Sequence, residues 1–116
     1  MLYPFILRKV FVEEIWGGRE FGKSLNMNLP EKVNIGESWE ISAHPNGMSV
    51  VENGYLKGKS LQEIYDEYKG KLVGEKIYSE YKERFPLLIK YLDVNDRLSI
   101  QVHPDDEVAL KKYNEL

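Results

Sequence analysis

The sequence predicts a mainly β fold with a helical insertion between its strands. Apolar and polar residues alternate from Gly36 to Ala43 and again from Leu98 to His103, as they do in half-buried strands. Between these segments, residues 61–68 repeat their apolar side chains at helical spacing. This order is typical of a β-sandwich or barrel that carries helices as decoration.

Length and composition narrow the classes of protein to which this chain can belong. With 116 residues, we expect residues 1–116 to form one domain with one core. The net charge of −3 and the interspersed lysines argue against a nucleic-acid partner, although a small anionic metabolite needs only a local cation. Cysteine is absent, which excludes thiolate chemistry. No signal peptide or transmembrane stretch is expected, so the sequence predicts a soluble, cytoplasmic protein with no membrane partner.

The first third of the chain predicts short strands and a loop. Residues 5–15 mix β-branched, aromatic and charged residues, which favours one or two strands, and Trp16-Gly17-Gly18 is expected to end them. Residues 19–23 fit a short helix or an irregular loop. The two glycines are interpreted as a turn rather than a phosphate motif. Residues 26–34 are polar and include Pro30, which predicts a loop.

The next strand is predicted over residues 36–43. Its apolar face holds Trp39, Ile41 and Ala43, and its polar face holds Ser38, Glu40 and Ser42. Turns are expected at His44-Pro45-Asn46-Gly47 and at Asn53-Gly54.

Helices are predicted after this strand and near the end of the sequence. Ser60-Leu61-Gln62-Glu63 has the form of a capping box, and a helix over residues 61–68 would bury Leu61, Ile64, Tyr65 and Tyr68. Gly70 and Gly74 interrupt the pattern, and residues 77–83 fit one or two further helical turns. Asp105 or Asp106 could cap a last helix with Val108 and Ala109 facing inward.

The stretch from Phe85 to Asp105 carries the candidate site. Two apolar runs flank Asn95-Asp96, which predicts two strands joined by a tight connection. In the second run, Leu98, Ile100 and Val102 share one face, and Ser99, Gln101 and His103 share the other. A hydroxyl, an amide and an imidazole therefore lie in a row.

Two residues of this row could bind a metal. An imidazole is a good zinc ligand, and the amide oxygen of Gln101 lies two residues from His103 on the same strand face. A single histidine is more often a structural residue, and spacing alone favours that alternative. The second histidine, His44, is interpreted as a solvent-facing loop residue. Asp105 and Asp106 could also be ligands but are favoured as helix caps.

Three other side chains have two interpretations each. Lys90 shares a predicted strand face with two leucines, so it either extends to water at a sheet edge or acts as a cation for an anionic substrate. Trp16 and Trp39 are either core residues, which base rates of burial favour, or the apolar wall of a sugar site.

Three segments together resemble a known family. They are Ile15-Trp16-Gly17-Gly18, residues 36–47 from Gly36-Glu37-Ser38-Trp39 to Pro45-Asn46-Gly47, and residues 85–105 with Leu98-Ser99-Ile100-Gln101-Val102-His103-Pro104-Asp105. In this order they resemble the amino-terminal part of bacterial type I mannose-6-phosphate isomerases. The resemblance implies part of a cupin-type β-barrel or jelly roll.

The resemblance also implies a chemistry and assigns residues to it. Family members interconvert mannose 6-phosphate and fructose 6-phosphate with one zinc ion, so the expected partner is a small sugar phosphate. By position, Gln101 and His103 match two zinc ligands, Ser99 matches a residue associated with the substrate phosphate, and Lys90 matches a lysine of the active-site strand. Trp16 and Glu40 lie in shared motifs without an assigned role. No catalytic acid or base is identified.

The resemblance covers the start of a longer family pattern, in which a glutamate and a second histidine complete the zinc site later in the chain. Three interpretations follow: a partial form of an isomerase, a non-catalytic sugar-phosphate-binding or assembly module derived from its fold, and a short enzyme completed by a partner chain. Unpaired strand edges would allow a homo-oligomer in each case.

Overall fold

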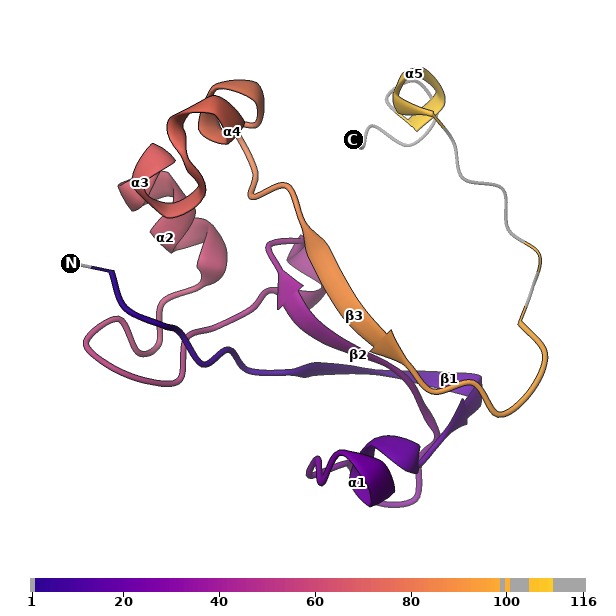
Figure 1. Cartoon of the computed structure of the whole chain (residues 1–116). Coiled ribbons are helices and arrows are strands. Elements are labelled where there is room, and N and C mark those ends of the chain that lie inside the picture. Colours follow the sequence, from indigo (N-terminus) through magenta and orange to yellow (C-terminus); the bar gives the residue numbers. More distant parts are fainter. Residues whose placement is uncertain (1, 99, 101–104, 110–116) are drawn as a thin grey trace.

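The computed structural model describes residues 2–98, 100 and 105–109, and the fold is a small open antiparallel sheet with helices inserted between its second and third strands (Figure 1). The elements in chain order are β1 (Val10–Gly18), α1 (Glu20–Ser24), β2 (Ile35–Ser42), the 3₁₀ helix η1 (Pro45–Gly47), α2 (Leu61–Tyr68), α3 (Gly70–Val73), α4 (Glu75–Glu80), β3 (Leu88–Leu92) and α5 (Asp106–Val108).

The strand β2 lies in the middle of the sheet, between β1 and β3. Both neighbours are antiparallel to it: Val10 of β1 and Lys90 of β3 are the partners of Trp39 on either side. The sequence predicted that the strand before Asn95-Asp96 would pair with the run after it. In the structure β3 pairs with β2, and Leu98 and Ile100 are not in a strand; the other residues of the predicted second strand, 99 and 101–103, lie outside the described residues. A local turn signal could not reveal this long-range pairing.

The strand β1 contains an irregularity that the sequence did not predict. Glu13 and Gly18 both pair with Ile35, so residues 14–17 loop out of the ladder as a wide bulge. The strand ends at Gly18, as the Trp16-Gly17-Gly18 segment predicted, although it reaches that end through the bulge. A Cβ on Gly17 would lie 2.5 Å from the backbone of Ile35, so the glycine serves close backbone approach.

Burial along residues 36–43 does not follow apolarity, although Ala43 is buried. Ser38 and Ser42 are fully buried, whereas Trp39 and Ile41 are half-buried. Hydrogen bonds offset the cost of burying these serines: the Ser38 hydroxyl donates to Glu40 (2.7 Å), and the hydroxyl of buried Ser49 accepts from the Ser42 amide (2.8 Å). The face that carries Trp39 is left partly open.

The helical insertion contains the main apolar core. The capping box forms as predicted: Ser60 Oγ accepts from the Glu63 amide at 3.1 Å, and the Glu63 carboxylate accepts from the Ser60 amide at 3.2 Å. The helix α2 then runs over the predicted residues and buries Leu61, Ile64 and Tyr65. The core cluster consists of Val51, Leu56 and Ile64, against which Leu2, Tyr3, Phe5, Leu7, Tyr68 and Leu72 pack.

The remaining connections largely follow the sequence. Residues 25–34 contain no helix or strand, as predicted. Asp105 directly precedes α5, its carbonyl accepts from the Ala109 amide at 2.9 Å, and Ala109 is half-buried. A helix long and apolar enough to cross a membrane is not found in the part of the chain that the structure describes.

Candidate functional site

Of the four predicted site residues, the structure describes Lys90. Ser99, Gln101 and His103 lie outside the described residues, so their proximity to one another stays a prediction. Lys90 is the central residue of β3, the edge strand of the sheet, and its backbone is paired with that of Trp39. Because side chains alternate along a strand, Lys90 shares a sheet face with its cross-strand partner.

An ion pair fixes the ammonium group of Lys90. Its Nζ donates to a carboxylate oxygen of Glu37 and lies 5.8 Å from the centre of the Trp39 ring, within the range of a cation–π contact. The Lys90 side chain keeps 38% of its surface exposed, whereas Glu37 keeps 13%. The cation therefore stays accessible while its anionic partner is largely enclosed, an arrangement that fits either interpretation of Lys90.

Two neighbours hold the Trp39 indole in place. A Cβ on Gly47 would lie 2.5 Å from Trp39 Cε3, so only glycine lets the η1 backbone approach the ring. His44 meets the ring edge-on at 6.1 Å, and its Nδ1 accepts from the Asn46 amide at 3.1 Å. His44 is thus half-buried and caps η1, rather than facing solvent as predicted. Trp39 is a rigid wall beneath the ammonium group.

The other residues of the shared motifs have structural contacts. Glu40 forms an ion pair with Lys9 and accepts from Ser38. The Trp16 ring crosses the Gly36 backbone so closely that a Cβ there would lie 2.8 Å from Trp16 Cη2. Trp16 is half-buried, consistent with packing against the sheet.

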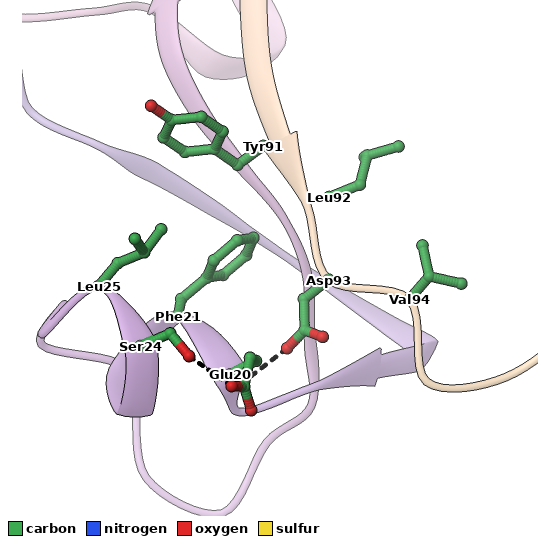
Figure 2. A pocket seen from close by; sticks show the side chains of 8 residues that line it. All are labelled: Glu20, Phe21, Ser24, Leu25, Tyr91, Leu92, Asp93 and Val94. Carbon is green, nitrogen blue, oxygen red and sulfur yellow. Dashed lines mark hydrogen bonds between the residues drawn. The ribbon is translucent and has the colours of Figure 1, made fainter.

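A separate hollow of about 300 Å³ lies between α1 and the end of β3 (Figure 2). Phe21, Leu25 and Tyr91 form its apolar side, and Asp93 accepts from the Glu20 amide at 2.8 Å at its base. Since Tyr91 and Lys90 are adjacent in β3, their side chains point to opposite faces of the sheet. The lining residues do not include any of the predicted site residues. They are Glu20, Phe21, Ser24, Leu25, Tyr91, Leu92, Asp93 and Val94.

The described residues do not by themselves supply a metal centre. Within residues 2–98, 100 and 105–109, no three His, Asp or Glu side chains gather closely enough to hold an ion. The two residues expected as zinc ligands, Gln101 and His103, lie outside this part of the chain.

Comparison with solved structures defines the architecture. The fold superposes on the mannose 6-phosphate isomerase of Bacillus subtilis with a TM-score of 0.81 and 41% identity, over 96% of this chain and 33% of that one. A phosphomannose isomerase from Salmonella typhimurium shares the fold at a TM-score of 0.74 and 22% identity. The sheet is therefore part of a cupin-type fold.

Sequence comparison gives the family. The model of the type I phosphomannose isomerase catalytic domain matches residues 5–115. The chain is 46% identical over 116 residues to the mannose-6-phosphate isomerase of Streptococcus mutans, covering 35% of it, and 41% identical over 109 residues to ManA of Bacillus subtilis, covering 31%. This chain belongs to the type I phosphomannose isomerase family, and it spans about a third of the length of these relatives.

Glu37 is the site residue that sequence reasoning missed. It lies two residues before Trp39, so alternation alone places both on one strand face. What the sequence could not supply was the partner strand, because the β2–β3 register decides that Lys90 comes to Glu37.

Proposed function

We propose that this chain forms the substrate-phosphate side of a mannose-6-phosphate isomerase site, in a family whose members carry that name. The observation that carries the proposal is the accessible ammonium of Lys90, which Glu37 orients above the Trp39 ring on one open sheet face. An ammonium beside an apolar wall suits a sugar phosphate, which presents a dianion and a ring with apolar faces.

Glu37 determines how the Lys90 ammonium group is oriented before an anion binds. In the absence of substrate the carboxylate holds the ammonium in one direction, so less side-chain entropy is lost when a phosphate arrives. A phosphate oxygen would share or replace this carboxylate as the partner of Nζ. Charge-assisted contacts of this kind contribute roughly 1.5–3 kcal/mol each.

The finer assignments complete the proposal. Ser99 binds the substrate phosphate with Lys90, and Gln101 and His103 supply two ligands of one zinc ion. The reaction is the interconversion of mannose 6-phosphate and fructose 6-phosphate, in which a proton moves between C1 and C2. The protein acts in the cytoplasm. These roles rest on family membership and the motif positions, and residues 1–116 form the amino-terminal portion of the isomerase domain.

The first experiment measures zinc content and mannose-6-phosphate isomerisation of this chain, with a Gln101→Ala/His103→Ala double variant beside it. Stoichiometric zinc and turnover that are both lost in the double variant would support the assignment. A folded wild-type chain that lacks both would refute autonomous catalysis.

A binding measurement separates the substrate role of Lys90 from catalysis. Calorimetric titration with mannose 6-phosphate should give about tenfold weaker binding for Lys90→Met than for wild type, because one charge-assisted contact is lost. Lys69→Met, which removes an exposed lysine from the helical insertion, is the matched control. Binding without turnover would favour the non-catalytic module, and equal binding by both variants would remove Lys90 from the site.

A further inference from the structure

The end of β3 contains a buried carboxylate that the proposed function does not use. All five residues of β3 are exposed. Among the described residues between 87 and 100, Asp93 alone is buried, with 8% of its surface exposed. Since aspartate is rarely buried without partners, its contacts indicate a specific task.

Asp93 and Asn95 join the end of β3 to three other segments. The Asp93 carboxylate accepts from the Glu20 amide at the start of α1 (2.8 Å), and the Asp93 amide donates to the Gly36 carbonyl at the start of β2 (2.9 Å). The Asn95 amide donates to the Trp16 carbonyl in the bulge of β1 (2.7 Å). Figure 2 shows the Asp93 side chain directed at the beginning of α1.

Gly18 makes this arrangement possible. A Cβ at Gly18 would lie 1.6 Å from Asn95 Nδ2 and 3.1 Å from Asp93 Oδ2, so a side chain there would force the Asn95 amide group to move and would crowd the Asp93 carboxylate. The second glycine of the Trp16-Gly17-Gly18 motif therefore provides room for Asp93 and Asn95.

The register of β3 depends on such polar contacts because apolar burial does not define it. Both faces of β3 carry exposed apolar side chains: Leu88 and Leu92 on one, Ile89 and Tyr91 on the other. A shift by one residue would therefore change apolar contacts little, yet it would turn Lys90 to the opposite face, away from Glu37 and Trp39. A buried polar group that accepts only one arrangement can specify register.

We propose that Asp93 is a positioning residue: its carboxylate, held by the Glu20 amide, fixes the register of β3 on β2 and so keeps Lys90 beside Glu37. The consequence for substrate binding rests on the proposed function, whereas the register itself does not. The proposal makes hydrogen-bond acceptance, rather than negative charge, the property that position 93 requires.

The direct test is cross-strand NMR. Wild-type chain should give nuclear Overhauser effects between Trp39 and Lys90, which are paired residues. Asp93→Asn, which keeps an acceptor oxygen, should retain them. Asp93→Ala should lose them or show a second set of β3 resonances, while contacts within α2 persist. Wild-type Trp39–Lys90 effects in a folded Asp93→Ala chain would overturn the proposal, and so would their loss in Asp93→Asn.

A second variant addresses the same contact without altering Asp93. Gly18→Ala should displace Asp93 and Asn95 and weaken the same cross-strand effects, even if Asp93→Ala does not fold. Gly22→Ala is the matched control, because a Cβ there would meet its nearest atoms at 3.5 Å, an ordinary contact. Equal Trp39–Lys90 effects in the two glycine variants would contradict the proposal.

Titration with mannose 6-phosphate links register to binding. Asp93→Ala should bind about tenfold more weakly, as expected for loss of the Lys90 contact, and Asp93→Asn should restore wild-type affinity. If wild-type chain binds no sugar phosphate, the proposed function fails while the NMR result still decides the role of Asp93. Unchanged affinity together with lost cross-strand effects would overturn the link between register and binding.

Discussion

The helical insertion and the β3 edge of the sheet are held in place by different forces. Ile64 in α2 is fully buried within an apolar cluster. Every residue of β3, in contrast, is exposed, and the strand is held by backbone pairing and the contacts of Asp93. The element that bears the candidate cation therefore contributes little buried surface to the fold. Its geometry depends on polar contacts, which contribute direction more than free energy.

The largest expected effect is a difference in the free energy of unfolding between alanine substitutions of one isoleucine from each region. Ile64→Ala should lower the free energy of unfolding by about 2–5 kcal/mol, because it leaves a cavity in the core. Ile89→Ala, at a side chain in β3 that is 44% exposed, should change it by about 0.5 kcal/mol or less. Urea unfolding of both variants measures the difference. Equal losses would show that the β3 edge is buried as deeply as α2.

A smaller effect is expected at the start of α2. Ser60→Ala removes the hydroxyl that accepts from the Glu63 amide and should cost about 1 kcal/mol. The control is Ser79→Ala in α4, where an exposed hydroxyl donates to the Lys76 carbonyl and alanine is the better helix former. Should the control cost as much as Ser60→Ala in urea unfolding, the capping box would not be the source of the stability.

The third expected effect is a loss of stability at alkaline pH that does not occur at neutral pH. Burial raises the pKa of Tyr65, with a smaller contribution from Tyr78, and the Tyr65 hydroxyl donates to the Tyr81 carbonyl. Because the folded state holds this proton more tightly, the stabilisation is fully present below the unfolded pKa of about 10. It is lost as the pH rises through the higher folded pKa.

Unfolding free energies measured from about pH 8 to about pH 11.5 test this. Tyr65→Phe should flatten the alkaline loss. Tyr55→Phe is the comparison variant: a hydrogen bond with Tyr68 raises the pKa of Tyr55 as well, but Tyr55 is exposed, so this variant should flatten the alkaline loss less than Tyr65→Phe does. A wild-type slope in Tyr65→Phe would place the titrating group elsewhere.

Local sequence signals were sufficient to predict the helical insertion. The sheet was predicted less completely, because its strands pair residues that are far apart in the sequence. The capping box and the spacing from Leu61 to Tyr68 gave α2 its observed bounds, because helix ends are set by residues three or four apart. The bulge of β1 depends on Ile35 accepting two partners, Glu13 and Gly18. No spacing within residues 10–18 encodes that.

The candidate site was predicted in part for the same reason. Lys90 was identified from its motif, but its partner Glu37 lies 53 positions away and becomes a neighbour only through the β2–β3 register. Likewise, alternation in residues 36–43 separated two faces, yet apolarity alone does not indicate which residues are buried. Hydrogen-bonded serines took the buried positions.

Because of the bulge in β1, the number of residues in this strand does not determine how it aligns with β2. Glu13 and Gly18 meet the same residue of β2, so the ladder on either side is defined without reference to the residues between them. Ile15, 94% exposed, can accept substitution without shifting one partner pair. Variation at this position can thus remodel the rim of the sheet while the positions of Trp39 and Lys90 stay the same.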